Sequence, residues 1–188
     1  MKAVFGLGNP GLAYALTRHN VGFEVVDLYR KVHRLRARGR IEHSALVYSW
    51  DDLLLVKPMT CMNYSGRAVR GVLAKHGIPA RNALVIFDDL DLPLGRLRVL
   101  AAGGPGSHKG MGSVVQCLGT EEVPRLRVGI EVEGRDAAGR DYVLDRFRPE
   151  EWQAVVPALE RAVEAIDLFR AVGIDAAMTR INRKLDLL

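Results

Sequence analysis

The sequence predicts a single three-layer α/β domain, in which a twisted, mixed but mainly parallel sheet is flanked by helices. Short apolar runs rich in β-branched residues alternate with segments of helical periodicity along most of the chain. This alternation favours a parallel sheet covered by helices on both faces. The length of 188 residues fits one domain, spanning 1–188, with a hydrophobic core of its own.

Each expected element follows from a local pattern. Strands are expected over 3–7, 45–50, 53–56, 84–87, 97–100 and 126–130. Helices are expected over 20–32, 63–76, 110–118, 150–172 and 175–182. The sequence Ser49-Trp50-Asp51-Asp52 predicts a tight hairpin turn, and with it an antiparallel pair of strands. Pro157 is expected to kink the long helix, and 184–188 to form a mobile tail.

The composition is that of an ordinary soluble protein. Hydrophobic residues make up 48% of the chain and charged residues 26%, which argues against a disordered, fibrous or membrane class. The first residues reach glycine and proline too soon for a secretory signal, and no segment approaches the roughly 20 apolar residues of a membrane span. Cys61 and Cys117 have no CxxC spacing, so neither a disulfide framework nor a zinc site is expected. We therefore expect a cytoplasmic protein with two reduced thiols.

The charge of the chain indicates a polyanionic partner. The net charge is +5 and the isoelectric point is near 9.5. Any one basic cluster is as consistent with solvated surface charge as with a binding site, but an excess spread over several elements favours nucleic acid. The clusters are 30–40, Arg96 with Arg98, Arg125 with Arg127, and 180–184.

Four polar segments fall where expected strands end. They are 8–11 continuing to His19, 57–63, 88–91 and 103–110. Because the carboxyl ends of strands in an α/β sheet meet at one edge, we expect these segments to converge there. A histidine, an acid and amide side chains gathered in this way make a site that activates water. The imidazole acts as the base, the carboxylate orients it, and asparagine amides hold a carbonyl group.

Two other interpretations of these segments are weaker. The sequence Gly6-Leu7-Gly8-Asn9-Pro10-Gly11 lacks the G-x-G-x-x-G spacing of a dinucleotide site, and Pro10 would disturb a helix that starts at the phosphate. A small-molecule nucleotide enzyme is therefore not favoured.

The acidic segment at 88–91 also has two interpretations. Asp88, Asp89 and Asp91 are a candidate cluster for a divalent metal, but the strand geometry directs their side chains apart. The simpler prediction is that Asp88, at the end of its strand, accepts a hydrogen bond from His19, while Asp91 helps to fold a turn. We expect no metal and no cofactor.

Taken together and in order, the motifs of this chain resemble those of bacterial-type peptidyl-tRNA hydrolase. The similar segments are Gly6-Leu7-Gly8-Asn9-Pro10-Gly11, Tyr14 with Thr17-Arg18-His19-Asn20, Thr60-Cys61-Met62-Asn63-Tyr64-Ser65-Gly66, Asp88-Asp89-Leu90-Asp91-Leu92-Pro93-Leu94-Gly95, the stretch 103–110, Arg125-Leu126-Arg127-Val128-Gly129-Ile130 and Asn182-Arg183. The resemblance covers nearly the whole chain, and several motifs in one order are far more specific than any one alone.

The resemblance implies a monomeric esterase that needs no metal. Its substrate would be peptidyl-tRNA, and it would cut the ester between the peptide and the 3′ ribose, so that the tRNA returns to translation. By this resemblance His19 is the catalytic base and Asp88 the carboxylate that orients it. The chemistry fits, because a neutral imidazole can take a proton from the attacking water while the carboxylate stabilises the imidazolium.

The resemblance also implies residues that hold the substrate. Asn9 and Asn63 match amides that position the peptide end and donate to the developing oxyanion. Tyr14 and Met62 match residues that line the cleft near the terminal nucleotide and the peptide. Each has a structural alternative, since Tyr14 and Met62 are also suited to packing and Asn9 to forming a turn.

Two positions depart from the family pattern. Lys109 stands where the family commonly has asparagine, and Leu100 stands where it often has a lysine that binds the 5′-phosphate of tRNA. Arg127 matches the other basic residue of that phosphate site, and Arg98 or Lys109 would compensate for the missing lysine. We hypothesise that Lys109 contacts a tRNA phosphate or the 3′-terminal ribose, with a solvent-exposed lysine as the alternative.

A second function class is a non-catalytic RNA-binding relative of the same fold, as some chloroplast splicing proteins are. The departures at Leu100 and Lys109 keep this class open. A protein that only binds RNA is free to lose the base or its carboxylate. Because both His19 and Asp88 are present, hydrolysis is favoured.

Overall fold

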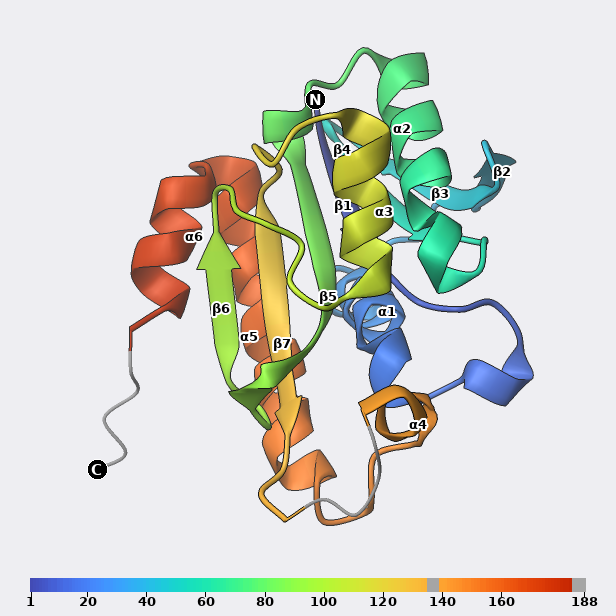
Figure 1. Ribbon diagram of the computed structural model, residues 1–188. Helices are drawn as coiled ribbons and strands as arrows, with labels where there is room; N and C mark the ends of the chain where they lie inside the picture. Colours follow the sequence, from blue (N-terminus) through green and yellow to red (C-terminus); the bar gives the residue numbers. More distant parts are fainter. Residues whose placement is uncertain (135–138, 184–188) are drawn as a thin grey trace.

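The computed structural model describes residues 1–134 and 139–183 (Figure 1). Within this part of the chain a single sheet of seven strands has the order β2-β3-β4-β1-β5-β7-β6. The strands are β1 (Lys2–Gly6), β2 (Arg40–Glu42), β3 (Ala45–Trp50), β4 (Leu53–Pro58), β5 (Ala83–Pro93), β6 (Leu97–Leu100) and β7 (Arg125–Glu131). The four central strands, β4, β1, β5 and β7, are parallel to one another. At one edge β3 and β2 are added by antiparallel pairing, and at the other edge β6 pairs antiparallel with β7. The predicted mixed, mainly parallel sheet is confirmed.

Helices cover both faces of the sheet, which gives the three expected layers (Figure 1). The α-helices are α1 (Val21–Val32), α2 (Ser65–His76), α3 (Lys109–Leu118), α4 (Gly139–Leu144), α5 (Trp152–Ala171) and α6 (Ile174–Ile181). Four short 3-10 helices are η1 (Leu12–Tyr14), η2 (Arg18–Asn20), η3 (Met62–Tyr64) and η4 (Ala80–Asn82). Strand β1 shows the alternation: Ala3 and Phe5 pack with α2 and α3, and Val4 packs with α1 and α5.

Most expected elements are present, and the differences have local causes. The hairpin between β3 and β4 is confirmed, with Trp50 paired to Leu53. Strand β2 was not predicted because Arg40 and Ile41 are exposed, so the segment has no apolar alternation. The six-residue helix α4 was not predicted either. Helix α5 continues through Pro157, and the expected tail at 184–188 lies outside the described residues.

The acidic segment lies in a strand and not in a turn. Strand β5 extends to Pro93, so the turn expected at Asp91 is wrong by a few residues. The chain turns at 93–96, where the amide of Arg96 donates to the carbonyl of Pro93. Strand β5 continues beyond its apolar residues because it stays paired with β7 as far as Pro93.

The sequence 6–11 does not form a dinucleotide-binding turn. After β1 the chain passes through η1 and η2, and α1 begins only at Val21. The α-helix that follows β1 therefore does not start within this loop as it would in a dinucleotide-binding turn, and the alternative of a nucleotide site loses its structural basis. Both cysteines are free, as expected. Among the described helices none combines the length and the apolar character needed to cross a membrane.

Two glycines allow α1 to pack directly on the end of β1. A Cβ atom at Gly6 would lie 2.0 Å from the carbonyl oxygen of Gly22, and one at Gly22 would lie 2.4 Å from the amide nitrogen of Leu7. Backbone atoms cannot yield in the way that a flexible side chain can. This contact fixes the start of α1, and with it η2, against the carboxyl end of the sheet.

We expect Gly22→Ala to lower the free energy of unfolding by at least about 1–3 kcal/mol, because the added methyl group meets backbone. Urea denaturation measures this change. Gly112→Ala is the matched control, since it lies in α3 with no atom closer than 4.0 Å to the new Cβ, and it should be neutral or slightly stabilising. Equal stability of the two variants would contradict the proposed close packing.

Candidate active site

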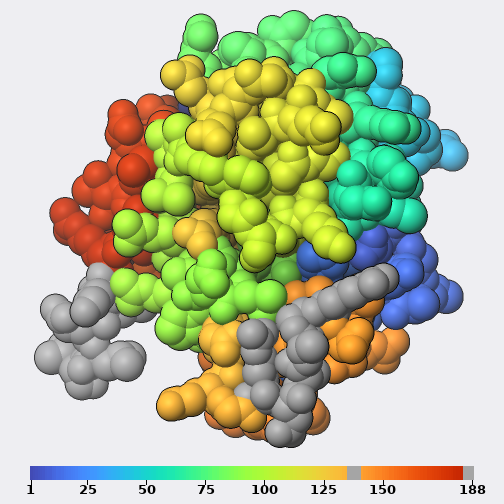
Figure 2. Space-filling view, in the orientation of Figure 1, coloured from blue at the N-terminus to red at the C-terminus, as the bar shows by residue number. Residues whose placement is uncertain are grey.

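A cavity of about 570 Å³ lies beyond the carboxyl ends of β1 and β4 and against the second half of β5. All four predicted polar segments contribute to its walls, together with residues of β6, β7 and α4. The lining includes Asn9, Tyr14, His19, Cys61, Met62, Asn63, Asp88, Asp89, Leu90, Asp91, Leu100, Lys109, Arg125, Arg127, Val143 and Leu144, with part of the glycine-rich segment. Figure 2 shows the amino-terminal segment, the glycine-rich segment and the residues near 140 adjoining one another on this face.

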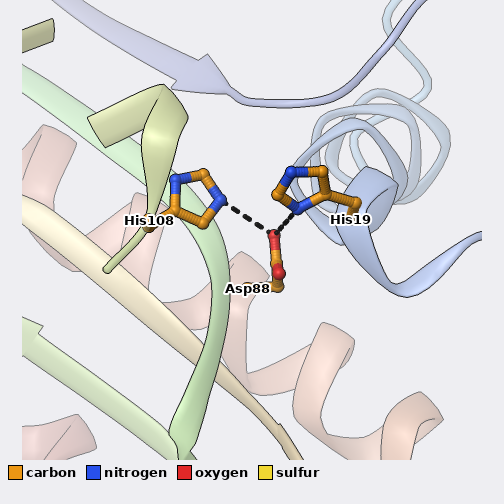
Figure 3. A group of neighbouring side chains, drawn as sticks. All are labelled: His19, Asp88 and His108. Carbon is orange, nitrogen blue, oxygen red and sulfur yellow. Dashed lines mark hydrogen bonds and ion pairs between the residues drawn. The ribbon is translucent and has the colours of Figure 1, made fainter. Parts of the chain in front are cut away.

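The structure brings His19 and Asp88 together at the floor of this cavity. Nδ1 of His19, on η2, lies 2.8 Å from Oδ1 of Asp88, on β5. Asp88 is buried and His19 is mostly buried. Figure 3 shows the second ring nitrogen of His19 directed away from the carboxylate.

A second histidine, His108, contacts the same carboxylate and was not among the residues predicted from the sequence. Its Nε2 lies 3.0 Å from Oδ1 of Asp88 (Figure 3). Its Nδ1 accepts a hydrogen bond of 3.1 Å from the amide of Met111, so His108 caps helix α3. The cap occupies the lone pair of Nδ1, which assigns the proton of the neutral ring to Nε2, where it is donated to Asp88. The available signal was its place two residues before the helix predicted over 110–118.

The hydrogen bonds also assign the proton of His19. Because Asp88 accepts from His19, the proton of the neutral ring lies on Nδ1 and the lone pair on Nε2. Burial raises the pKa of the Asp88 carboxyl, but His108 and His19 outweigh burial and hold this pKa well below its ordinary value. Asp88 is therefore an ionised acceptor at neutral pH, and Nε2 of His19 is free to accept a proton.

The three neighbouring carboxylates divide between two sets of partners. Asp88 contacts His19 and His108, whereas Asp89 and Asp91 both lie against Arg127. Asp89 forms an ion pair with Arg127 and accepts from the amide of Asp91, and Oδ2 of the exposed Asp91 lies 3.8 Å from Nη2 of Arg127. Among the described residues, these three acids do not form a group of metal ligands.

The residues best placed to hold a metal are instead His19, Asp88 and His108, whose ligand atoms all lie within 4.8 Å of one another. Their contact distances of 2.8 and 3.0 Å are those of hydrogen bonds. A metal ion would displace both hydrogen bonds and the Nε2 proton that the α3 cap assigns to His108. The arrangement therefore fits a hydrogen-bonded dyad supported by a second histidine.

Asn9 presents an amide donor to the cavity. Its Oδ1 accepts a 2.8 Å hydrogen bond from the amide of Met62, which orients the side-chain amide with Nδ2 on the other side. Asn20 holds the backbone of Asn9 with two bonds: its Oδ1 accepts from the amide, and its Nδ2 donates to the carbonyl. Asn20 is thus a positioning residue that the sequence analysis did not single out, although it lies in the same motif as His19.

The other predicted substrate residues all reach the cavity. Tyr14, Met62, Asn63 and Lys109 line it. Met62 is only 5% exposed, so it belongs to the core as well as to the cavity wall. Asn63 and Lys109 are exposed, and Tyr14 is 38% exposed.

Two arginines lie side by side at one end of the cavity. Arg127 lines it, and Arg98 lies directly opposite Arg127 in the antiparallel pair of β6 and β7. Side chains of such partners start about 4.5–5.5 Å apart. Arg98 is exposed and does not line the cavity, whereas Leu100 does. Arg127 is held by Asp89 and Asp91, so Arg98 is the member of the pair that has no carboxylate partner among the described residues.

A buried ion pair anchors the turn that carries His19. Arg18 donates to both carboxylate oxygens of Glu151, at 2.9 and 2.7 Å, and its guanidinium lies 4.1 Å from the centre of the Tyr142 ring. It also donates to the carbonyls of Tyr142 and Arg146. Arg18 therefore ties η2 to α4 and to the segment before α5, a connection that the sequence did not reveal.

The fold and the site define an α/β enzyme of the hydrolytic class, with an imidazole and a carboxylate at the carboxyl edge of the sheet. A family model described as peptidyl-tRNA hydrolase matches residues 3–187. The chain belongs to the peptidyl-tRNA hydrolase family.

Proteins of this family are similar to the chain over nearly its whole length. It is 44% identical to the peptidyl-tRNA hydrolase of Carboxydothermus hydrogenoformans over 97% of this chain and 99% of that protein. It is 45% identical to the peptidyl-tRNA hydrolase of Chloroflexus aggregans, with the same coverage of 97% and 99%. The crystal structure of peptidyl-tRNA hydrolase from Acinetobacter baumannii superposes with a TM-score of 0.86 at 28% identity, covering 97% of this chain and 94% of that one.

Proposed function

We propose that this chain hydrolyses the ester between a peptide, or an N-blocked aminoacyl group, and the 3′ end of tRNA, releasing tRNA for reuse in translation. Membership of the peptidyl-tRNA hydrolase family supports this activity. The observation that carries the proposal is the contact of 2.8 Å between His19 and a buried, ionised Asp88, which leaves Nε2 of His19 open to the cavity.

The proposed reaction begins with a water molecule between His19 and the ester carbonyl. Nε2 of His19 takes a proton from this water as its oxygen bonds to the carbonyl carbon, and Asp88 stabilises the imidazolium. Nδ2 of Asn9 donates a hydrogen bond to the oxyanion that forms, and Asn63 lies across the same cavity to hold the peptide. When the carbon–oxygen bond to the ribose breaks, the imidazolium returns its proton to the leaving ribose oxygen.

His108 is proposed to position the carboxylate. It donates to the same oxygen of Asp88 as His19 does, and its ring is held by the α3 cap. Asp88 thus stays oriented while His19 gains and loses its proton. Tyr14 and Met62 are proposed to line the path of the terminal nucleotide and the peptide.

Arg98, Arg127 and Lys109 are proposed to bind phosphate groups of the tRNA end. Asp89 and Asp91 both offset the charge of Arg127, whereas Arg98 and Lys109 have no carboxylate partner among the described residues, so the three cations exceed the two carboxylates by one charge. A phosphate tolerates a range of cation positions, which allows this pair to replace the lysine expected at Leu100.

Replacing Lys109 with alanine is expected to weaken substrate binding and to reduce the slope of log affinity against log salt by about 1, because one phosphate contact is lost. Hydrolysis of an N-blocked aminoacyl-tRNA measured over a range of salt concentrations gives KM and its salt slope. Arg81→Ala, which removes an exposed charge on η4 at the opposite end of the strands, is the control. An unchanged rate and slope would remove Lys109 from the site.

The direct test of the function is incubation of the protein with an N-blocked aminoacyl-tRNA, with and without a chelator. We expect deacylation in both samples, since the dyad needs no metal. Loss of activity with the chelator would overturn the metal-free mechanism, and no deacylation at all would overturn the function. A protein that only binds RNA is not favoured, because the base and its carboxylate remain in contact.

We propose that the protein is a monomer and acts in the cytoplasm. Both edge strands of the sheet, β6 and β2, are protected against pairing with another chain. Asn182 accepts from the amide of Val99 and donates to its carbonyl, which occupies the edge of β6, and β2 is a short strand that begins with Arg40. Sedimentation of the purified protein would test the monomer.

A further inference from the structure

The segment between α1 and β2 carries a row of arginines that the cavity does not use. Every second residue is arginine and is exposed, whereas the residues between them are half-buried. We call this set the arginine row, and it consists of Arg34, Arg36, Arg38 and Arg40.

The alternation arises because the backbone of this segment lies on the sheet. Leu35 packs against the core cluster that includes residues of α1 and α5. A Cβ atom at Gly39 would lie 2.6 Å from Cδ1 of Leu46 and 2.7 Å from Cε1 of Tyr48, both on β3. With one side of the segment against β3, the arginine side chains are directed to solvent. Arg34 lies in the turn that ends α1, and the charges of Arg36, Arg38 and Arg40 follow it along the segment into β2.

Most of the charge of the row is not neutralised within the described chain, since only Arg40 has a carboxylate partner there. The nearest carboxylate is that of Glu42, whose Oε1 lies 3.9 Å from Nε of Arg40. Glu42 is already bound by His76 at 2.9 Å and by Lys75 at 3.1 Å, and these contacts lower its pKa. No described carboxylate forms an ion pair with the other three arginines of the row.

The row continues along α2 toward the cavity. A Cβ atom at Gly71 of α2 would lie 2.6 Å from Cβ of His43, so the turn after β2 packs on this helix. Arg67 and Arg70 are exposed on α2, and the guanidinium of Arg67 lies 4.9 Å from the centre of the Tyr64 ring. Tyr64 ends η3, whose first two residues line the cavity. Figure 1 shows α2 and β2 on the same side of the molecule.

We propose that the arginine row and the exposed face of α2 form a second RNA-binding surface, which takes the phosphodiester backbone of RNA outside the cavity. Arginine binds phosphate through several donors, and a row of mostly unpaired arginines suits a regularly charged polymer better than a single anion. Continuity with a cavity that receives an RNA terminus favours RNA, and this last argument rests on the proposed function. The bound RNA is either the body of the substrate tRNA or a separate molecule.

The test begins with the binding of deacylated tRNA and of an unrelated single-stranded RNA to the triple variant Arg34→Gln, Arg36→Gln and Arg38→Gln. The matched control replaces Arg81, Arg180 and Arg183 by glutamine, which removes the same charge from other exposed places. We expect the triple variant to bind roughly ten- to a hundredfold more weakly at about 0.1 M salt, with a salt slope about 2 lower. The proposal is overturned if its affinity and slope equal those of the wild type, or if the control loses as much.

Hydrolysis distinguishes the two sources of RNA. If the row binds the body of the substrate, the triple variant loses kcat/KM on a full-length N-blocked aminoacyl-tRNA but not on an N-blocked aminoacyl-adenosine. If it binds a separate RNA, both rates are kept while binding of the unrelated RNA falls. An equal loss on both substrates would indicate damage to the cavity and would overturn the proposal. Failure of the wild type to cleave either substrate would refute the proposed function, whereas the binding comparison would still test the row.

Discussion

Replacing His19 with alanine is expected to lower the rate of ester hydrolysis by roughly 10²- to 10⁴-fold, the usual contribution of a general base. The loss should appear in kcat, since His19 removes a proton in the transition state and is not placed to bind the tRNA body. The ring is mostly buried but makes its one side-chain hydrogen bond to Asp88, so the fold should tolerate the change. Single-turnover hydrolysis of an N-blocked aminoacyl-tRNA measures the effect on the chemical step.

A matched control separates the loss of this imidazole from the loss of any histidine. His76→Ala removes a ring that also contacts a carboxylate, Glu42, but lies at the end of α2 outside the cavity. It should leave the rate constant of the chemical step unchanged. Turnover retained in His19→Ala, with the circular dichroism of the wild type, would refute the assignment of the base.

The sequence was informative where the pattern of the chain is local. Strands β3 and β6 are short runs of mostly apolar residues, and their predicted bounds agree with the structure. The short β2 has no such apolar run, because its side chains are mostly exposed. Backbone pairing with β3 makes it a strand. Periodicity cannot detect a strand whose side chains are not buried.

The site shows the same division between local and distant information. The rule that polar strand ends converge predicted that His19 and Asp88 would lie in one place, and they are in contact. The roles of His108 and Asn20 depend on hydrogen bonds to atoms far away in the sequence, at Asp88 and at Asn9. Their residue types are equally common in caps and turns, so the sequence alone does not assign them.

The anchoring of η2 by Arg18 gives the second large expected effect. Arg18 is 2% exposed and Glu151 is 7% exposed, so breaking the pair leaves a buried charge without its partner. We expect Arg18→Met to lower the free energy of unfolding by about 3–5 kcal/mol. Because Arg18 directly precedes His19, kcat should also fall in the folded fraction. Urea denaturation measures the first effect, and hydrolysis at a temperature where the variant is folded measures the second.

Two further variants test whether burial of the Arg18–Glu151 pair causes the expected loss of stability. Arg180 forms an ion pair of 2.8 Å with Glu164, but their side chains are 65% and 39% exposed, so Arg180→Met should cost about 1 kcal/mol or less. In the double variant Arg18→Met with Glu151→Gln no buried charge is left alone, and part of the lost stability should return. If Arg18→Met costs no more than Arg180→Met, the pair does not anchor η2. In that case the position of His19 depends on the glycine contact between α1 and β1 and on the hydrogen bonds of Asn20.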